Sequence, residues 1–268
     1  MTINETTNEN QTPGMVLSQE ELIYVIGLLK GESIPGLDLQ SFIDLEQDEK
    51  ELVLMITERA LRARGLAAMD EEGQLLLNRQ MLDLVTTCLI AEKGILCQFL
   101  PKGEGPGEAF NVFGNQGQWV AKWMVQPGLY SVVTLPNQDQ LLEAVTAATS
   151  CQNLKNGAFT PLTLSETVLV EGRRLAAEQK TAEAARLWVE NGGDPLGAAE
   201  VAGLLSRVPD VAVIHLFTRK GEQAEVKSMT IIQDSQCSVL LQHLQDVFEL
   251  SPFSTEDLTT LLREWMDA

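Results

Sequence analysis

The sequence predicts an α+β protein, in which helices pack on antiparallel sheets. Amphipathic segments with helical spacing are grouped together, and blocks of consecutive short strand candidates follow them. The turns between the strands are short and rich in Gly and Pro, as is typical of hairpins. The same order of helices, strands and a closing helix occurs twice along the 268 residues.

The composition is that of an ordinary globular protein, with 44% hydrophobic and 21% charged residues. The charge is unbalanced, because 19 Lys and Arg face 38 Asp and Glu, a formal net charge of −19. Such an acidic chain is poorly suited to nucleic acid or anionic membranes, which are bound largely through Lys and Arg. Since no stretch reaches the roughly 18 apolar residues of a membrane helix and no signal pattern is present, we expect a cytoplasmic protein.

The N-terminal region begins with a polar segment. Residues 1–14 are rich in Asn, Thr, Glu and Gln and are expected to form a disordered tail. Ser18 then begins a helix with an acidic first turn, which ends at Gly31. A second helix is predicted over 48–64 and ends at Gly65. Its expected buried stripe consists of Leu52, Met55, Ile56, Ala60 and Leu61.

A short hairpin over 66–77 and a helix over 79–90 follow, so this region has the outline of a winged-helix module. Arg59, Arg62 and Arg64 would be the cations of a DNA-binding surface. Carboxylates near them favour ion pairs at the helix end instead, namely Glu58, Asp70, Glu71 and Glu72. A winged-helix transcriptional regulator is therefore the second hypothesis, after a protein-binding one.

Two blocks of strand candidates dominate the rest of the chain. The first block covers 95–100, 109–115, 119–126 and 129–135, and a helix over 139–148 closes it. Helices are then predicted over 165–179, 181–191 and 195–207. The second block covers 211–218, 225–233, 237–244 and 247–250, and Ser254 caps a last helix over 255–266. This repeated order predicts an internal duplication, with halves 15–150 and 151–268 related by a pseudo-two-fold axis and packed as one unit.

No set of residues in the sequence matches a catalytic or metal-binding site. His215 and His243 both fall in strand candidates, and the segment 103–107 lacks the Lys and Ser or Thr of a phosphate loop. The cysteines lack metal-ligand spacing and are expected to be reduced and buried: Cys88, Cys97, Cys151 and Cys237. We therefore expect no catalytic residue, no metal and no cofactor, and an enzyme is the third hypothesis.

The candidate partner-binding residues are two tryptophans and two charged hairpins. Alternation along a strand places Trp119 and Trp123 on one face, where they would either fill the core or anchor a partner. The two hairpins share a Lys-Gly-Glu sequence, at Lys102, Gly103, Glu104 and at Lys220, Gly221, Glu222. We expect the binding surface to include these hairpins and the central sheet.

Two stretches of the first half carry a likeness to a known family. Residues 16–20 (Val-Leu-Ser-Gln-Glu) open an apolar helix that ends at Gly31. Residues 60–66 (Ala-Leu-Arg-Ala-Arg-Gly-Leu) precede a polar turn and a helix with Val85 and Cys88. With the duplicated sheet, this layout resembles the EspG family, the cytosolic chaperones of type VII (ESX) secretion systems.

The resemblance implies a pseudo-two-fold α+β fold and a role in keeping an aggregation-prone secreted protein soluble. In that family the clients are PE–PPE heterodimers, held at a helical tip of the PPE protein, and no binding residue carries over by position. The leading hypothesis is therefore a non-enzymatic, EspG-like chaperone with a helical or secreted protein client. The sequence leaves its client and oligomeric state open.

Overall fold

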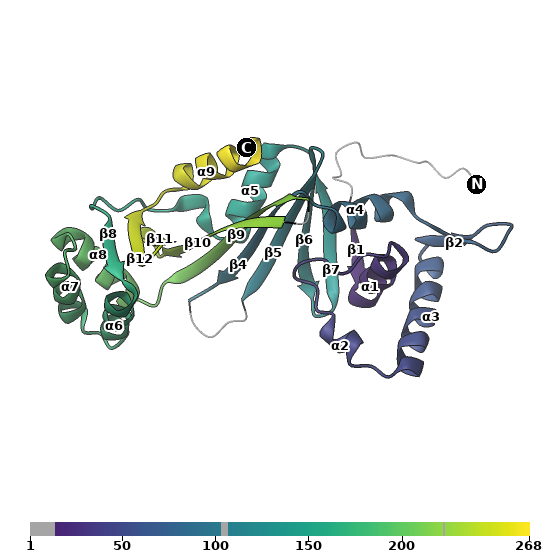
Figure 1. Ribbon diagram of the computed structural model, residues 1–268, viewed down its shortest axis with the longest axis horizontal. Helices are drawn as coiled ribbons and strands as arrows, with labels where there is room; N and C mark the ends of the chain where they lie inside the picture. The colour runs from purple at the N-terminus through teal and green to yellow at the C-terminus, as the bar shows by residue number, and fades with distance from the viewer. Residues whose placement is uncertain (1–13, 103–106, 222) are drawn as a thin grey trace, which may run out of the picture. The chain divides into compact units, whose positions relative to one another are not determined.

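The computed structural model describes residues 14–102, 107–221 and 223–268 (Figure 1). The predicted tail lies outside these residues except for Gly14, which begins the first strand. The described chain combines helices with antiparallel strands, which confirms the α+β class. Its contacts group into two compact units, residues 1–92 with 111–137 and residues 93–110 with 138–268.

The first unit contains a sheet in the order β1-β7-β6-β5, a separate β2-β3 hairpin and several helices. The strands are β1 (Gly14–Ser18), β2 (Ala67–Met69), β3 (Leu75–Leu77), β5 (Glu108–Asn115, of which 111–115 belong here), β6 (Gln118–Gln126) and β7 (Leu129–Leu135). The helices are α1 (Gln19–Leu28), α2 (Gln40–Ile43), α3 (Gln47–Ala63) and α4 (Arg79–Leu89).

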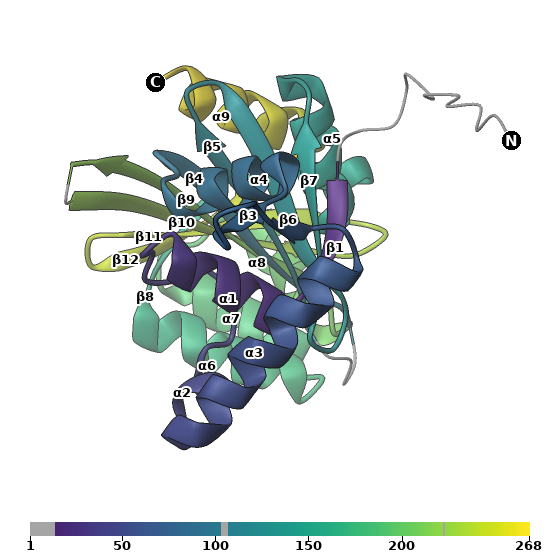
Figure 2. The same ribbon diagram turned by 90° about the vertical axis from the view of Figure 1, so that its right-hand side faces the viewer.

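Helix α1 starts where the sequence predicts. Ser18 is its N-cap, and Ser18 and Glu21 form a reciprocal capping box. One side of the helix buries Leu22, Val25 and Ile26. Helices α1 and α3 lie side by side (Figure 2), and Tyr24 Oη donates a hydrogen bond to Glu58 Oε2 at 3.4 Å between them.

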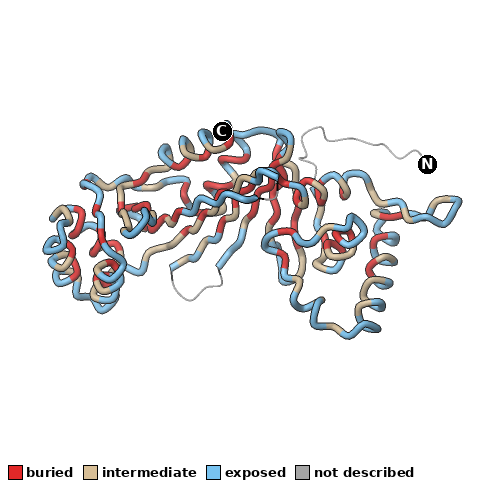
Figure 3. The backbone as a smooth tube through the Cα atoms, viewed as in Figure 1, coloured by how far each residue is buried: buried red, intermediate tan, exposed pale blue. Residues whose placement is uncertain are grey.

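The predicted buried stripe of α3 is wrong apart from Leu61. Ala60 is exposed, and the side chains of Leu52, Met55 and Ile56 are 51%, 44% and 55% exposed. Figure 3 shows long exposed stretches on this helix. The reason is that α3 carries two apolar faces, and α1 packs on the one that buries Leu61 and Thr57, four residues apart. The other face has no cover within the described chain.

The second unit contains a sheet in the order β4-β9-β10-β11-β12-β8, with antiparallel neighbours throughout. The strands are β4 (Lys93–Leu100), β8 (Leu162–Ser165), β9 (Asp210–Lys220), β10 (Gln223–Gln233), β11 (Ser238–Leu244) and β12 (Val247–Pro252). The helices are α5 (Gln138–Ala148), the 3-10 turn η1 (Cys151–Asn153), α6 (Glu166–Ala177), α7 (Thr181–Glu190), α8 (Pro195–Ser206) and α9 (Thr255–Asp267).

Helices α6, α7 and α8 form a bundle, and α9 lies beside α5 (Figure 1). Trp188 fills the centre of the bundle, fully buried, and its Nε1 donates to the Val168 carbonyl at 3.2 Å. The ring lies against Gly172, where a Cβ would come within 2.1 Å of the indole nitrogen. The bundle therefore depends on a small residue at this contact.

The order of elements in the two halves of the sequence matches the prediction. Strands β4 to β7 precede α5, and α6 to α8 and then β9 to β12 precede α9. The internal duplication and its two-fold axis remain predictions, as do the halves 15–150 and 151–268. The contact-based units assign β4 and α5 to the second unit.

Candidate partner-binding surfaces

The two predicted hairpin lysines lie at opposite ends of one pair of strands. Strands β4 and β9 are antiparallel, with Lys93 opposite Thr218 and Leu100 opposite Val211. Lys102 follows the end of β4, and its backbone N–H donates to Asp210 Oδ1 at 2.6 Å, where β9 begins. Lys220 ends β9, an 11-residue strand about 33 Å long.

Both lysines are exposed, but the structure does not bring them together. A partner that contacts both must lie along the β4–β9 pair. The predicted partner residues Glu104 and Glu222 lie outside the described residues.

Trp119 and Trp123 occupy one face of β6, as the alternation predicts. They lie opposite Leu135 and Ser131 of β7 in a continuous ladder. Trp119 is only 8% exposed, and its ring lies over Gly114, where a Cβ would come within 2.4 Å of it. Trp123 is half-buried. Trp123 is therefore the indole with more surface available to a partner.

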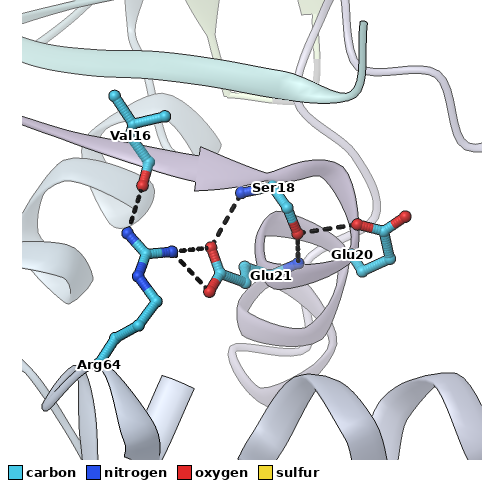
Figure 4. A network of polar contacts seen from close by, with 5 residues as sticks. All are labelled: Val16, Ser18, Glu20, Glu21 and Arg64. Carbon is cyan, nitrogen blue, oxygen red and sulfur yellow. Dashed lines mark hydrogen bonds and ion pairs between the residues drawn. The ribbon is translucent and has the colours of Figure 1, made fainter. Parts of the chain in front are cut away.

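The arginines of the predicted winged-helix segment are engaged within the protein. Arg64 Nη1 contacts both carboxylate oxygens of Glu21, and Arg64 Nη2 donates to the Val16 carbonyl at 2.7 Å (Figure 4). Arg62 pairs with Glu58 at 3.6 Å, and Arg59 Nη2 lies 3.6 Å from Met55 Sδ. Of the predicted neighbouring carboxylates, only Glu58 forms an ion pair with one of these arginines in the described chain, and Arg64 pairs with Glu21 instead. These contacts do not favour a phosphate-binding surface.

A lysine is buried inside the first unit. Lys122 is 1% exposed; its Nζ donates to the Gly36 carbonyl at 3.0 Å and lies 4.7 Å from the centre of the Tyr130 ring. Burial lowers the pKa of Lys122 to about 8 from its ordinary value of 10.5. Because the ammonium group is enclosed, Lys122 is a structural residue rather than part of a surface site.

Each histidine contacts a neighbouring side chain, and the cysteines are buried. His215 Nδ1 lies 2.7 Å from Ser228 Oγ on the neighbouring strand, and the His243 ring stacks on Phe248. All the cysteines are buried and unpaired, and burial raises the pKa of Cys88 to about 12. No three His, Cys, Asp or Glu side chains in the described chain could hold a metal ion together. Among the described helices, none has the length and apolar character required to cross a membrane.

The fold is that of an EspG-like protein, which confirms the resemblance predicted from the sequence. The structure of the Mycobacterium tuberculosis type VII secretion system chaperone EspG5, in complex with the PE25–PPE41 dimer, is similar with a TM-score of 0.65. The likeness covers 95% of this chain and 96% of that chain at 10% sequence identity. No protein-family model matches the sequence, and no curated protein matches it.

Proposed function

We propose that this chain is a chaperone-type protein that binds a protein client and keeps it soluble. The observation that carries the proposal is the whole-length likeness to EspG5, a secretion chaperone whose structure contains a bound protein dimer. Since fold alone does not determine function, the surface chemistry must fit as well.

The described surface suits protein binding. Leu52, Met55 and Ile56 form an exposed apolar stripe on α3, with Ile56 at 55% exposed, and such a stripe suits contact with a partner. The cysteines are buried, and His215 contacts Ser228 on the neighbouring strand. Reduced cysteines fit the further proposal that the protein works in the cytoplasm.

Two separate client contacts are proposed, one in each unit. In the second unit they are the exposed Lys102 and Lys220, and in the first unit the sheet residues Trp119 and Trp123. The predicted contacts Glu104 and Glu222 lie outside the described residues. The strand register adds a constraint, because Lys102 and Lys220 are separated by the length of β9. An elongated client, such as a helical protein, could follow the β4–β9 pair and contact both ends. In a chain of net charge −19, these exposed lysines would give local attraction for acidic groups of the client.

The first experiment is a pull-down with the tagged full-length chain from its native cytosol, followed by mass spectrometry. We expect one protein to be retained in nearly the same amount as the tagged chain. We expect this client to be a helical or secreted protein. Retention of DNA alone would contradict the proposal and favour the winged-helix regulator.

Substitutions then locate the surface. We expect Lys102→Glu and Lys220→Glu each to reduce the client retained about tenfold, because charge reversal at a contact opposes binding. Arg79→Glu is the matched control. The Arg79 side chain on α4 is 95% exposed, and its ion pair with Asp83 is long, at 3.9 Å. If all three variants retain the client equally, the hairpins are not the binding surface.

A further inference from the structure

Strand β10 has one fully paired edge and one largely open edge. It pairs with β9 along its whole length, from Gln223 to Gln233. Its pairing with β11 covers only Thr230 to Gln233, and toward their tips the β9–β10 and β11–β12 hairpins separate (Figure 2). We call residues 223–228 of β10 the open edge, because the described chain provides no strand opposite them on that side.

The open edge is accessible and ready for pairing. All six of its residues are exposed, and Val226 at its centre is 58% exposed. On an edge strand, every second residue directs its backbone N–H and C=O away from the sheet, so these groups form a template for another strand.

The charges on the open edge are balanced, in contrast to the chain as a whole. Glu225 and Lys227 flank Val226 and lie on the same face of the strand, two residues apart. Neither side chain has an ion-pair partner within 4 Å among the described residues. A locally neutral segment in a chain of net charge −19 is a place where two copies can approach each other.

Strand geometry restricts how two copies of this edge can pair. Along a strand, residues alternately point their backbone N–H and C=O toward the neighbouring strand and away from it. Two residues directly opposite each other in an antiparallel pair must point these groups in the same way. The two-fold axis of a symmetric pair therefore passes between one residue and its copy in the other subunit. A centre at Glu225 or Lys227 would place like charges opposite each other, which is destabilising. A centre at Val226 places Glu225 opposite Lys227 of the partner subunit, and the two-fold axis repeats this pair.

The same register is favourable for the neighbouring residues. Val226 then lies opposite its own copy, a β-branched pair that suits a sheet. Ala224 lies opposite Ser228 of the partner subunit, so small side chains meet. The sequence of the open edge is therefore self-complementary in charge, size and polarity.

We propose that two copies of this chain associate through the open edge, forming an antiparallel pair of β10 strands with Val226 at the two-fold axis. The segment is short and both copies are acidic, so the dimer is weak and depends on concentration. The association requires no client and is therefore independent of the proposed chaperone function.

The test is sedimentation velocity of the full chain over a wide concentration range, together with charge-swap variants. We expect the native chain to show a reversible monomer–dimer equilibrium. Glu225→Lys and Lys227→Glu, each alone, place like charges opposite each other twice and should weaken the dimer about tenfold or more. The double variant E225K/K227E restores both opposite-charge pairs and should dimerise within about threefold of the native chain.

A mixture of the two single variants gives the sharpest result. Each single variant alone should dimerise about tenfold or more weakly than the native chain. The mixture should form a heterodimer, because the two lysines of the E225K chain then meet the two glutamates of the K227E chain. If only the repulsion between two acidic chains mattered, E225K should instead associate more strongly, because its net charge is smaller in magnitude, −17 (−19 + 2) instead of −19. Circular dichroism checks that both exposed substitutions leave the fold intact.

Three results would overturn the proposal. The native chain could remain monomeric at all concentrations, the single variants could dimerise as the native chain does, or the mixture could fail to associate. The first would show that the open edge is not used for self-association, and the other two would exclude the register centred on Val226.

Discussion

Arg64, at the C-terminal end of α3, donates hydrogen bonds to both carboxylate oxygens of Glu21 in α1, at 2.7 and 2.5 Å. The Glu21 side chain is only 5% exposed, whereas that of Arg64 is 45% exposed. Glu21 Oε2 also accepts from the Ser18 backbone N–H at 2.9 Å. The pair therefore joins the end of one helix to the capped start of another, and it satisfies a buried carboxylate.

Removal of the Arg64 guanidinium should destabilise the first unit. In Arg64→Met the Glu21 carboxylate loses its charged partner while still buried, and we expect the free energy of unfolding to fall by about 1–3 kcal/mol. Urea denaturation at pH 7 measures it. Arg62→Met is the control, because Arg62 forms an exposed pair with Glu58 and should change stability by less than about 0.5 kcal/mol. Equal effects of the two variants would contradict this role for Arg64.

The two faces of α3 should respond differently to substitution. Ile56 is 55% exposed, so Ile56→Gln should change the free energy of unfolding by less than about 0.5 kcal/mol. Leu61 is fully buried, so Leu61→Ala should lower it by about 2–4 kcal/mol. Urea denaturation compares the two. A large loss in Ile56→Gln would show that the stripe with Leu52 and Met55 is packed after all.

The buried Lys122 should make stability depend on pH in the alkaline range. Burial lowers its pKa to about 8, so between pH 8 and 10.5 the unfolded chain binds more protons at this side chain than the folded chain does. Stability from this group therefore rises with pH through that window. In Lys122→Met the contribution is absent, and the difference in unfolding free energy between native chain and variant should change by about 2 kcal/mol from pH 7.5 to 9.5.

An exposed lysine provides the comparison. Lys155→Met is the control, since Lys155 is exposed. If the Lys122 and Lys155 variants have the same profile, burial does not perturb Lys122 as described.

The cysteine thiols should be unreactive in the folded protein. Burial raises the pKa of Cys151 and of Cys237 to about 11, and it raises the pKa of Cys97 as well. Reaction with a thiol reagent such as DTNB at pH 8 should be limited by unfolding, because access and ionisation are both suppressed. In denaturant all four cysteines should react at once. Fast reaction of even one thiol in the native protein would contradict its burial.

Local chemistry made much of the fold predictable. Ser18 and Ser254 cap α1 and α9 as expected, because an N-cap depends on residues within one turn. The last helix, predicted over 255–266, is observed over Thr255–Asp267. The two blocks of strands are predictable for the same reason, since turn residues and the alternation of apolar and polar residues are local signals.

Long-range packing was not predictable in this way. The sequence of α3 offers two apolar faces, and only the position of α1 decides that Leu61 is buried while Leu52 is exposed. Likewise, Lys102 and Lys220 have similar local sequences, but the antiparallel pairing of β4 with β9 separates them. The open edge of β10 also depends on where its pairing with β11 stops, at Thr230.

A chaperone of the proposed type must keep its client protein soluble. The most direct measurement is the soluble fraction of the client retained in the pull-down, expressed alone and together with this chain. We expect the client alone to aggregate and the co-expressed client to remain in solution as a stoichiometric complex. A client that is equally soluble without this chain would contradict the chaperone function.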